Sequence, residues 1–112
     1  MKVLLLLMLM FPLMACEPET RFERNLYLVK QPLPGAESVG AANLGGFYLA
    51  GEEVPKNYIL AYSWYSISLT QGFTEASPVL ASLEQELTTE QIALAQEIAA
   101  KCFKSGFIDC GY

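Results

Sequence analysis

The 112-residue sequence predicts an all-α protein of about four helices. Two observations carry this prediction. Apolar residues recur at helical spacing in four successive segments, and glycine, proline or capping residues stand between those segments. No segment alternates convincingly between apolar and polar residues, apart from a short strand candidate at residues 26–29.

The first two helices flank a loop of glycine, charged residues, valine and proline. The first of them is expected over residues 38–49. The second presents one stripe at positions i, i+3, i+4 and i+8 and ends at Gly72. Small and aromatic residues replace a plain leucine stripe, which predicts that the two helices pack closely. The stripe consists of Ala61, Trp64, Tyr65 and Leu69.

The third and fourth helices follow without a long loop. Residues 74–87 have the clearest amphipathic pattern, and Pro78 stands close enough to its start to be tolerated. The fourth helix begins with a capping box in which Thr88 is the N-cap and Gln91 reaches back. Its buried face is expected to contain Ile92, Ala95, Ile98, Ala99 and Cys102.

Residues 1–15 have the composition of a secretory signal peptide, because one lysine precedes a short apolar run. The run is shorter than the roughly 20 residues that a membrane-spanning helix needs. Its end, Leu13-Met14-Ala15-Cys16, resembles the lipobox of bacterial lipoproteins, in which the signal is cut before a cysteine that then carries lipid. Cys16 is therefore the expected lipid attachment site, and residues 16–37, rich in proline, are expected to form an extended tether. The alternative is a secreted protein without lipid.

The other two cysteines, Cys102 and Cys110, form an even number in an oxidising compartment, which predicts a disulfide. Continuous helix would hold their Cα atoms about 12 Å apart, whereas a disulfide needs roughly 4.4–6.8 Å. The helix must therefore turn back between them, and Ser105-Gly106 is the expected place. A structural bond is favoured over a redox site, which more often reads Cys-x-x-Cys. Two free thiols are the remaining alternative.

Charge and composition exclude several functions. The formal net charge is −5 and becomes more negative when Lys2 leaves with the signal. No basic cluster is present, so we expect no nucleic-acid partner. The chain has no histidine, which excludes histidine-based acid–base catalysis and histidine-ligated metal sites. No catalytic residue, cofactor or metal site is predicted, and the paired carboxylates are expected on solvated faces.

A set of spaced residues in the first helix pair resembles the Sel1-like repeat, a relative of the tetratricopeptide repeat. The resemblance implies antiparallel helical hairpins of an α-solenoid, with residues 38–112 forming one repeat and a C-terminal hairpin. Residues 66–68 and 52–53 depart from the family pattern. The matching residues are Leu44, Gly45, Tyr48, Gly51, Val54, Pro55, Ala61, Trp64, Tyr65 and Gly72.

The resemblance implies an interaction or scaffold module on the periplasmic side of a bacterial envelope, rather than an enzyme. Its partner would be an unidentified envelope protein or peptide, contacted through Tyr58 and Tyr62. Two alternatives remain. One is a cysteine-rich Sel1-like enzyme that binds or hydrolyses β-lactams, and the other is a self-assembling structural lipoprotein.

Overall fold

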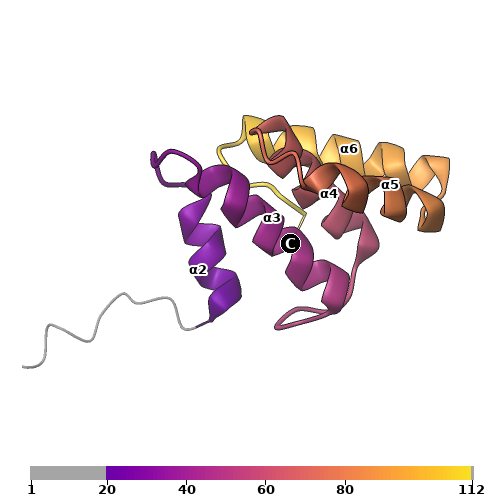
Figure 1. Cartoon of the computed structure of the whole chain (residues 1–112), viewed down its shortest axis with the longest axis horizontal. Coiled ribbons are helices and arrows are strands. Elements are labelled where there is room, and N and C mark those ends of the chain that lie inside the picture. The colour runs from indigo at the N-terminus through magenta and orange to yellow at the C-terminus, as the bar shows by residue number, and fades with distance from the viewer. Residues whose placement is uncertain (1–19, 112) are drawn as a thin grey trace, which may run out of the picture.

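The computed structural model describes residues 20–111, and within that range the protein is entirely helical (Figure 1). The predicted all-α class is therefore confirmed. No helix in this range is long and apolar enough to cross a membrane. The signal peptide and the lipobox with Cys16 were predicted for residues outside those described. The helices are α2 (Arg21–Leu28), α3 (Ala36–Ala50), α4 (Tyr58–Thr70), α5 (Ala76–Glu86) and α6 (Thr89–Lys104).

Helix α2 occupies part of the segment predicted to be an extended tether. Thr20 Oγ1 accepts a hydrogen bond from the Glu23 N–H at 3.1 Å, and Glu23 Oε2 accepts one from the Thr20 N–H at 3.2 Å. This capping box satisfies two N–H groups at the start of the helix. The predictions of an extended conformation over residues 21–28 and of a strand at residues 26–29 are therefore wrong.

Close packing joins α2 to α3. A Cβ atom added at Gly40 of α3 would lie 2.9 Å from Val29 Cγ1, so a side chain there would collide with the residue that ends α2. Phe22 of α2 places its ring edge against two aromatic rings of α3, those of Phe47 and Tyr48. Helix α2 is thus a packed part of the fold.

Helix α3 extends beyond the predicted residues 38–49 at both ends. It stops at Gly51, whose φ of 70° is left-handed and whose N–H donates to the Phe47 carbonyl at 2.9 Å. Helix α4 then begins behind Asn57, whose Oδ1 accepts a hydrogen bond from the Leu60 N–H at 3.1 Å. Both helices match the predicted pair.

Helix α4 lies at the centre of the core, because α3, α5 and α6 all pack against it. Trp64 is 0% exposed, and its ring stacks on that of Phe107 with centroids 6.4 Å apart. Ala61 and Ile67 of the same helix are also buried. So are Leu80 of α5 and Ala95, Ala99 and Cys102 of α6. The predicted stripe around Trp64 therefore does face the core.

Helix α6 begins as predicted. The Gln91 N–H donates to Thr88 Oγ1 at 3.1 Å, and the Thr88 N–H donates to Gln91 Oε1 at 2.9 Å. After α6 ends, left-handed φ angles at Gly106 and Phe107 reverse the chain. The reversal brings the Cα atoms of Cys102 and Cys110 to 4.2 Å, and the two residues form a disulfide.

Candidate functional site

The repeat-motif residues gather where α3 meets α4. Leu44, Ala61 and Trp64 are 0% exposed, and Tyr48 is also buried. Val54 packs against this core from the connecting loop. Gly51 and Gly72 lie just beyond the ends of α3 and α4 with positive φ. The buried members of the set and the two turn glycines therefore shape the scaffold.

Gly45 of α3 lies directly against the Tyr65 ring of α4. A Cβ atom at Gly45 would lie 2.8 Å from Tyr65 Cδ2 and 3.1 Å from Tyr65 Cγ. Real Cβ atoms do not approach other atoms so closely, so the Tyr65 ring fits because Gly45 has no side chain. This contact confirms the close packing predicted from the small and aromatic residues.

The two tyrosines predicted to face a partner differ in their surroundings. Tyr62 is 5% exposed, and its hydroxyl donates to Glu84 Oε1 at 2.8 Å. Burial, and then the nearby Glu84 carboxylate, raise the pKa of Tyr62. Little of the Tyr62 ring is therefore exposed, although Tyr62 lines a depression between α4 and α5, and its contact with a partner stays a prediction. Tyr58 is half-buried, and Lys56 Nζ lies 5.1 Å from its ring centroid, so a cation covers part of its face.

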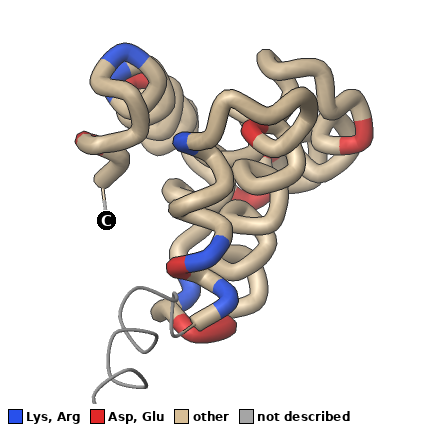
Figure 2. The backbone as a smooth tube through the Cα atoms, turned by 90° about the vertical axis from the view of Figure 1, so that its left-hand side faces the viewer, with Lys and Arg blue, Asp and Glu red and all other residues tan. Residues whose placement is uncertain are grey.

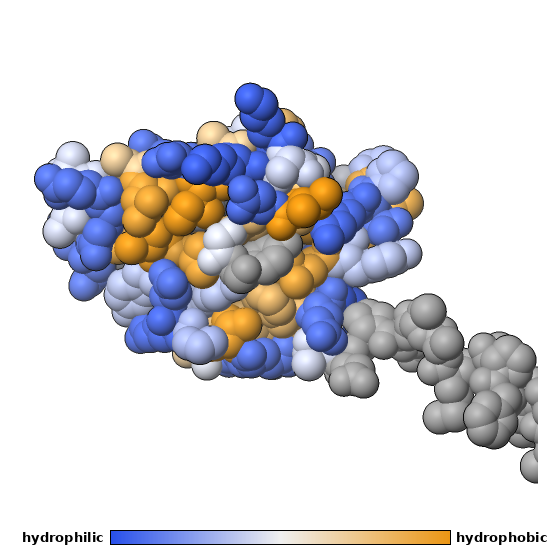
Figure 3. All heavy atoms as spheres, turned by 180° about the vertical axis from the view of Figure 1, so that it is seen from behind, coloured by the Kyte–Doolittle hydropathy of each residue, from blue (hydrophilic) through white to orange (hydrophobic). Residues whose placement is uncertain are grey.

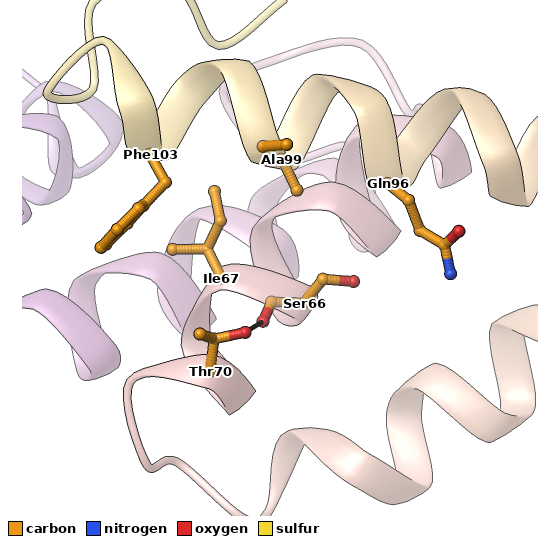
Figure 4. Close-up of a pocket in the computed structure, with 7 residues that line it drawn as sticks. Ser66, Ile67, Thr70, Gln96, Ala99 and Phe103 are labelled. Carbon is orange, nitrogen blue, oxygen red and sulfur yellow. Dashed lines mark hydrogen bonds between the residues drawn. The ribbon is translucent and has the colours of Figure 1, made fainter.

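A depression of about 290 Å³ lies between α4 and α6 (Figure 4). Ile67, Ala99 and Phe103 make its surface apolar, and Phe103 is 51% exposed. Thr70, at its α4 edge, donates its hydroxyl hydrogen to the Ser66 carbonyl at 2.9 Å. Sequence patterns missed this feature, although Ala99 and Phe103 stand one helical turn apart on α6.

A second depression, of about 390 Å³, adjoins the first and extends toward α5. It shares Ser66, Thr70 and Gln96 with the first. Its remaining lining includes Ala81 and Glu84 of α5. We call the two depressions together the α4 groove. The groove combines apolar walls with polar groups along its centre.

Charged residues of both signs meet where α2 starts beside the α3–α4 loop, at the lower end of the tube in Figure 2. Arg21 Nε lies 3.2 Å from Glu53 Oε1, and Arg21 Nη2 lies 3.5 Å from Glu52 Oε2. Glu53 Oε2 also accepts a hydrogen bond from the Phe22 N–H at 2.7 Å. That bond, and then Arg21, lower the pKa of Glu53. Glu53 has a φ of 62°, an unusual value for a residue with a side chain.

Beside this cluster, a cleft of about 620 Å³ lies between α2, α3 and α4. Arg24 and Asn25 line it from α2, Asn43 and Gly46 from α3, and Tyr65 from α4. Sequence reasoning missed the cleft because it treated α2 as a tether. The Thr20-x-x-Glu23 capping signal could have revealed the helix.

Comparisons of the chain with family models, curated proteins and solved structures find no match. Residues 20–111 contain no group of three or more histidine, cysteine, aspartate or glutamate residues that could hold a metal ion. The α4 groove and the α2–α3–α4 cleft are the two candidate binding surfaces.

Proposed function

We propose that the protein is an interaction or scaffold module of a bacterial cell envelope, built on a Sel1-like repeat and held at a membrane by lipid on Cys16. In this proposal α3 and α4 form the repeat hairpin, and α5 and α6 form the terminal hairpin of a short α-solenoid. The contact between Gly45 and Tyr65 carries the proposal, because two motif residues make the close helix contact that such a repeat needs.

The α4 groove is the surface proposed for the partner. Its apolar walls suit an apolar side chain of an envelope protein or peptide, and covering the half-exposed Phe103 ring would remove apolar area from water. Ser66 and Gln96 supply polar groups that can pair with the backbone of the bound segment. On the face opposite that of Figure 1, apolar side chains also lie exposed in patches among hydrophilic ones (Figure 3).

Site-specific photo-crosslinking in intact bacterial envelopes tests the proposal. A photoreactive residue replaces Ala100, an exposed position that lines the groove, and a second variant carries it at Lys30, exposed beyond α2. We expect one stoichiometric partner from position 100 and none from position 30. Recovery of the protein alone, or crosslinked only to itself, would contradict the proposal and favour self-assembly, which concentration-dependent sedimentation would then measure.

Intact-mass analysis tests the membrane attachment separately. We expect loss of residues 1–15, added acyl mass on Cys16, and a mass two hydrogens below that of the reduced chain because of the Cys102–Cys110 bond. A mature chain of unmodified mass that starts elsewhere would refute the lipid anchor while leaving the groove proposal intact.

A further inference from the structure

The cleft between α2, α3 and α4 contains a fixed side-chain amide. Asn25 is 8% exposed, and both ends of its side-chain amide are used. Its Nδ2 donates to the Arg21 carbonyl at 2.8 Å, and its Oδ1 accepts a hydrogen bond from Asn43 Nδ2 at 3.0 Å. The second bond positions the Asn43 amide at the cleft and leaves its other N–H without a partner among residues 20–111.

Two further donors line the same cleft. Arg21 and Glu52 also line the cleft, but they pair with each other and Arg21 pairs with Glu53 as well, whereas Arg24 forms no ion pair within the described part of the chain. The Tyr65 hydroxyl makes no hydrogen bond there either, and burial alone raises the pKa of Tyr65, so the group stays protonated as a donor. A Cβ atom at Gly46 would be 3.5 Å from this hydroxyl, so the glycine leaves the space beside it open.

We propose that this cleft is a binding site for a carboxylate, with Arg24 supplying the charge and Asn43 and Tyr65 the flanking donors. A carboxylate is an acceptor with two oxygens, so it can pair with more than one of the donors that line this cleft. Arginine favours planar carboxylates in particular because its guanidinium is a planar fork of N–H groups. The carboxylate belongs to a peptide, either at its C-terminus or on an acidic side chain. This site lies apart from the α4 groove and does not depend on it.

Nuclear magnetic resonance of the ¹⁵N-labelled, detergent-solubilised full chain tests the site. The probes are acetyl-dialanine with a free carboxylate, its C-terminal amide, and acetyl-aspartate amide. We expect saturable shifts of the Asn43 side-chain amide and the Gly46 backbone amide with a carboxylate probe and none with the uncharged amide. The acetyl-aspartate amide arm separates an acidic side chain from a chain terminus as the source.

Single variants separate the site from general electrostatic attraction. Arg24→Gln removes a charge-assisted hydrogen bond and is expected to raise the dissociation constant about tenfold or more. Tyr65→Phe removes one neutral donor and is expected to raise it by a factor of about two to ten. Lys104→Gln, a matched loss of charge on α6, should leave it unchanged. The circular dichroism spectrum of each variant checks that the helices remain folded.

Three results would overturn the proposal. They are no saturable shift with either carboxylate probe, equal shifts with the uncharged amide, and equal weakening by Arg24→Gln and Lys104→Gln. None of these results bears on crosslinking at Ala100, so failure here and failure of the proposed envelope function remain distinguishable.

Discussion

Neighbouring glycines on α3 should respond in opposite ways to the same substitution. In Gly45→Ala, the new methyl would lie 2.8 Å from Tyr65 Cδ2 and 3.1 Å from Tyr65 Cγ. Rotating the ring does not move Cγ, so α3 and α4 must shift apart. Overpacking of this kind costs about 1–3 kcal/mol. The better helix propensity of alanine returns about 0.5–1 kcal/mol, which leaves a net loss of about 1 kcal/mol.

Gly46→Ala is the matched control. Its methyl would be 3.5 Å from Tyr65 Oη, an ordinary contact, so only the propensity gain of about 0.5–1 kcal/mol remains. Urea unfolding followed by circular dichroism measures the free energy of unfolding of both variants. In thermal unfolding, each kcal/mol corresponds to a shift of roughly 4–8 °C in Tm for a domain of this size. Adding Tyr65→Ala should remove most of the Gly45→Ala penalty, which a double-mutant cycle reports. Equal effects at the two glycines would refute the reasoning.

Three more predictions concern the core, the disulfide and the charge cluster. Trp64→Ala should lower the free energy of unfolding by about 3–5 kcal/mol, because Trp64 is 0% exposed; a chain of unchanged stability in urea would contradict this. Replacing Cys102 and Cys110 together by alanine should cost about 2–3 kcal/mol in the same assay, and a smaller loss than 1 kcal/mol would show that the closed loop is already ordered without the bond. Glu53→Gln should lower Tm at neutral pH. The pKa of Glu53 in the folded protein lies below the usual pKa of glutamate, so the difference in Tm between the variant and wild type should be full above the usual pKa and should vanish as the pH falls through the folded pKa. A difference in Tm that does not depend on pH would refute the role of the charge.

Sequence patterns predicted α3 to α6 because each has a local signal that tertiary packing does not override. The Thr88 capping box and the glycine after α3 are such signals, since their hydrogen bonds form within a few residues. The Cys102–Cys110 pairing was also predictable, because two cysteines remain once Cys16 is set aside, and their spacing then requires a turn between them.

The errors arose where distant parts of the chain decide the outcome. Helix α2 is short, and isolated helices of its length are unstable in water, so its formation depends on Phe22 packing against α3 and on Glu53 binding its first turn. Packing of α5 against α4 likewise buries most of the Tyr62 ring. The α2–α3–α4 cleft depends on the same long-range contacts, so no local pattern could place Arg24 and Tyr65 in one cleft.

The α3–α4 pair has apolar area on two sides, and a different segment of the chain covers each side. On one side, α2 lays Phe22 across Phe47 and Tyr48, and the Glu53 carboxylate holds its first turn. On the other, the segment after α6 stacks Phe107 on Trp64, and a disulfide closes that segment. The Phe107 ring packs against the edge of the α4 groove at Phe103, with ring centroids 6.1 Å apart, but Phe103 itself stays 51% exposed. An apolar surface left exposed in this way is the feature on which the proposed partner binding rests, so the crosslink at Ala100 is the decisive measurement.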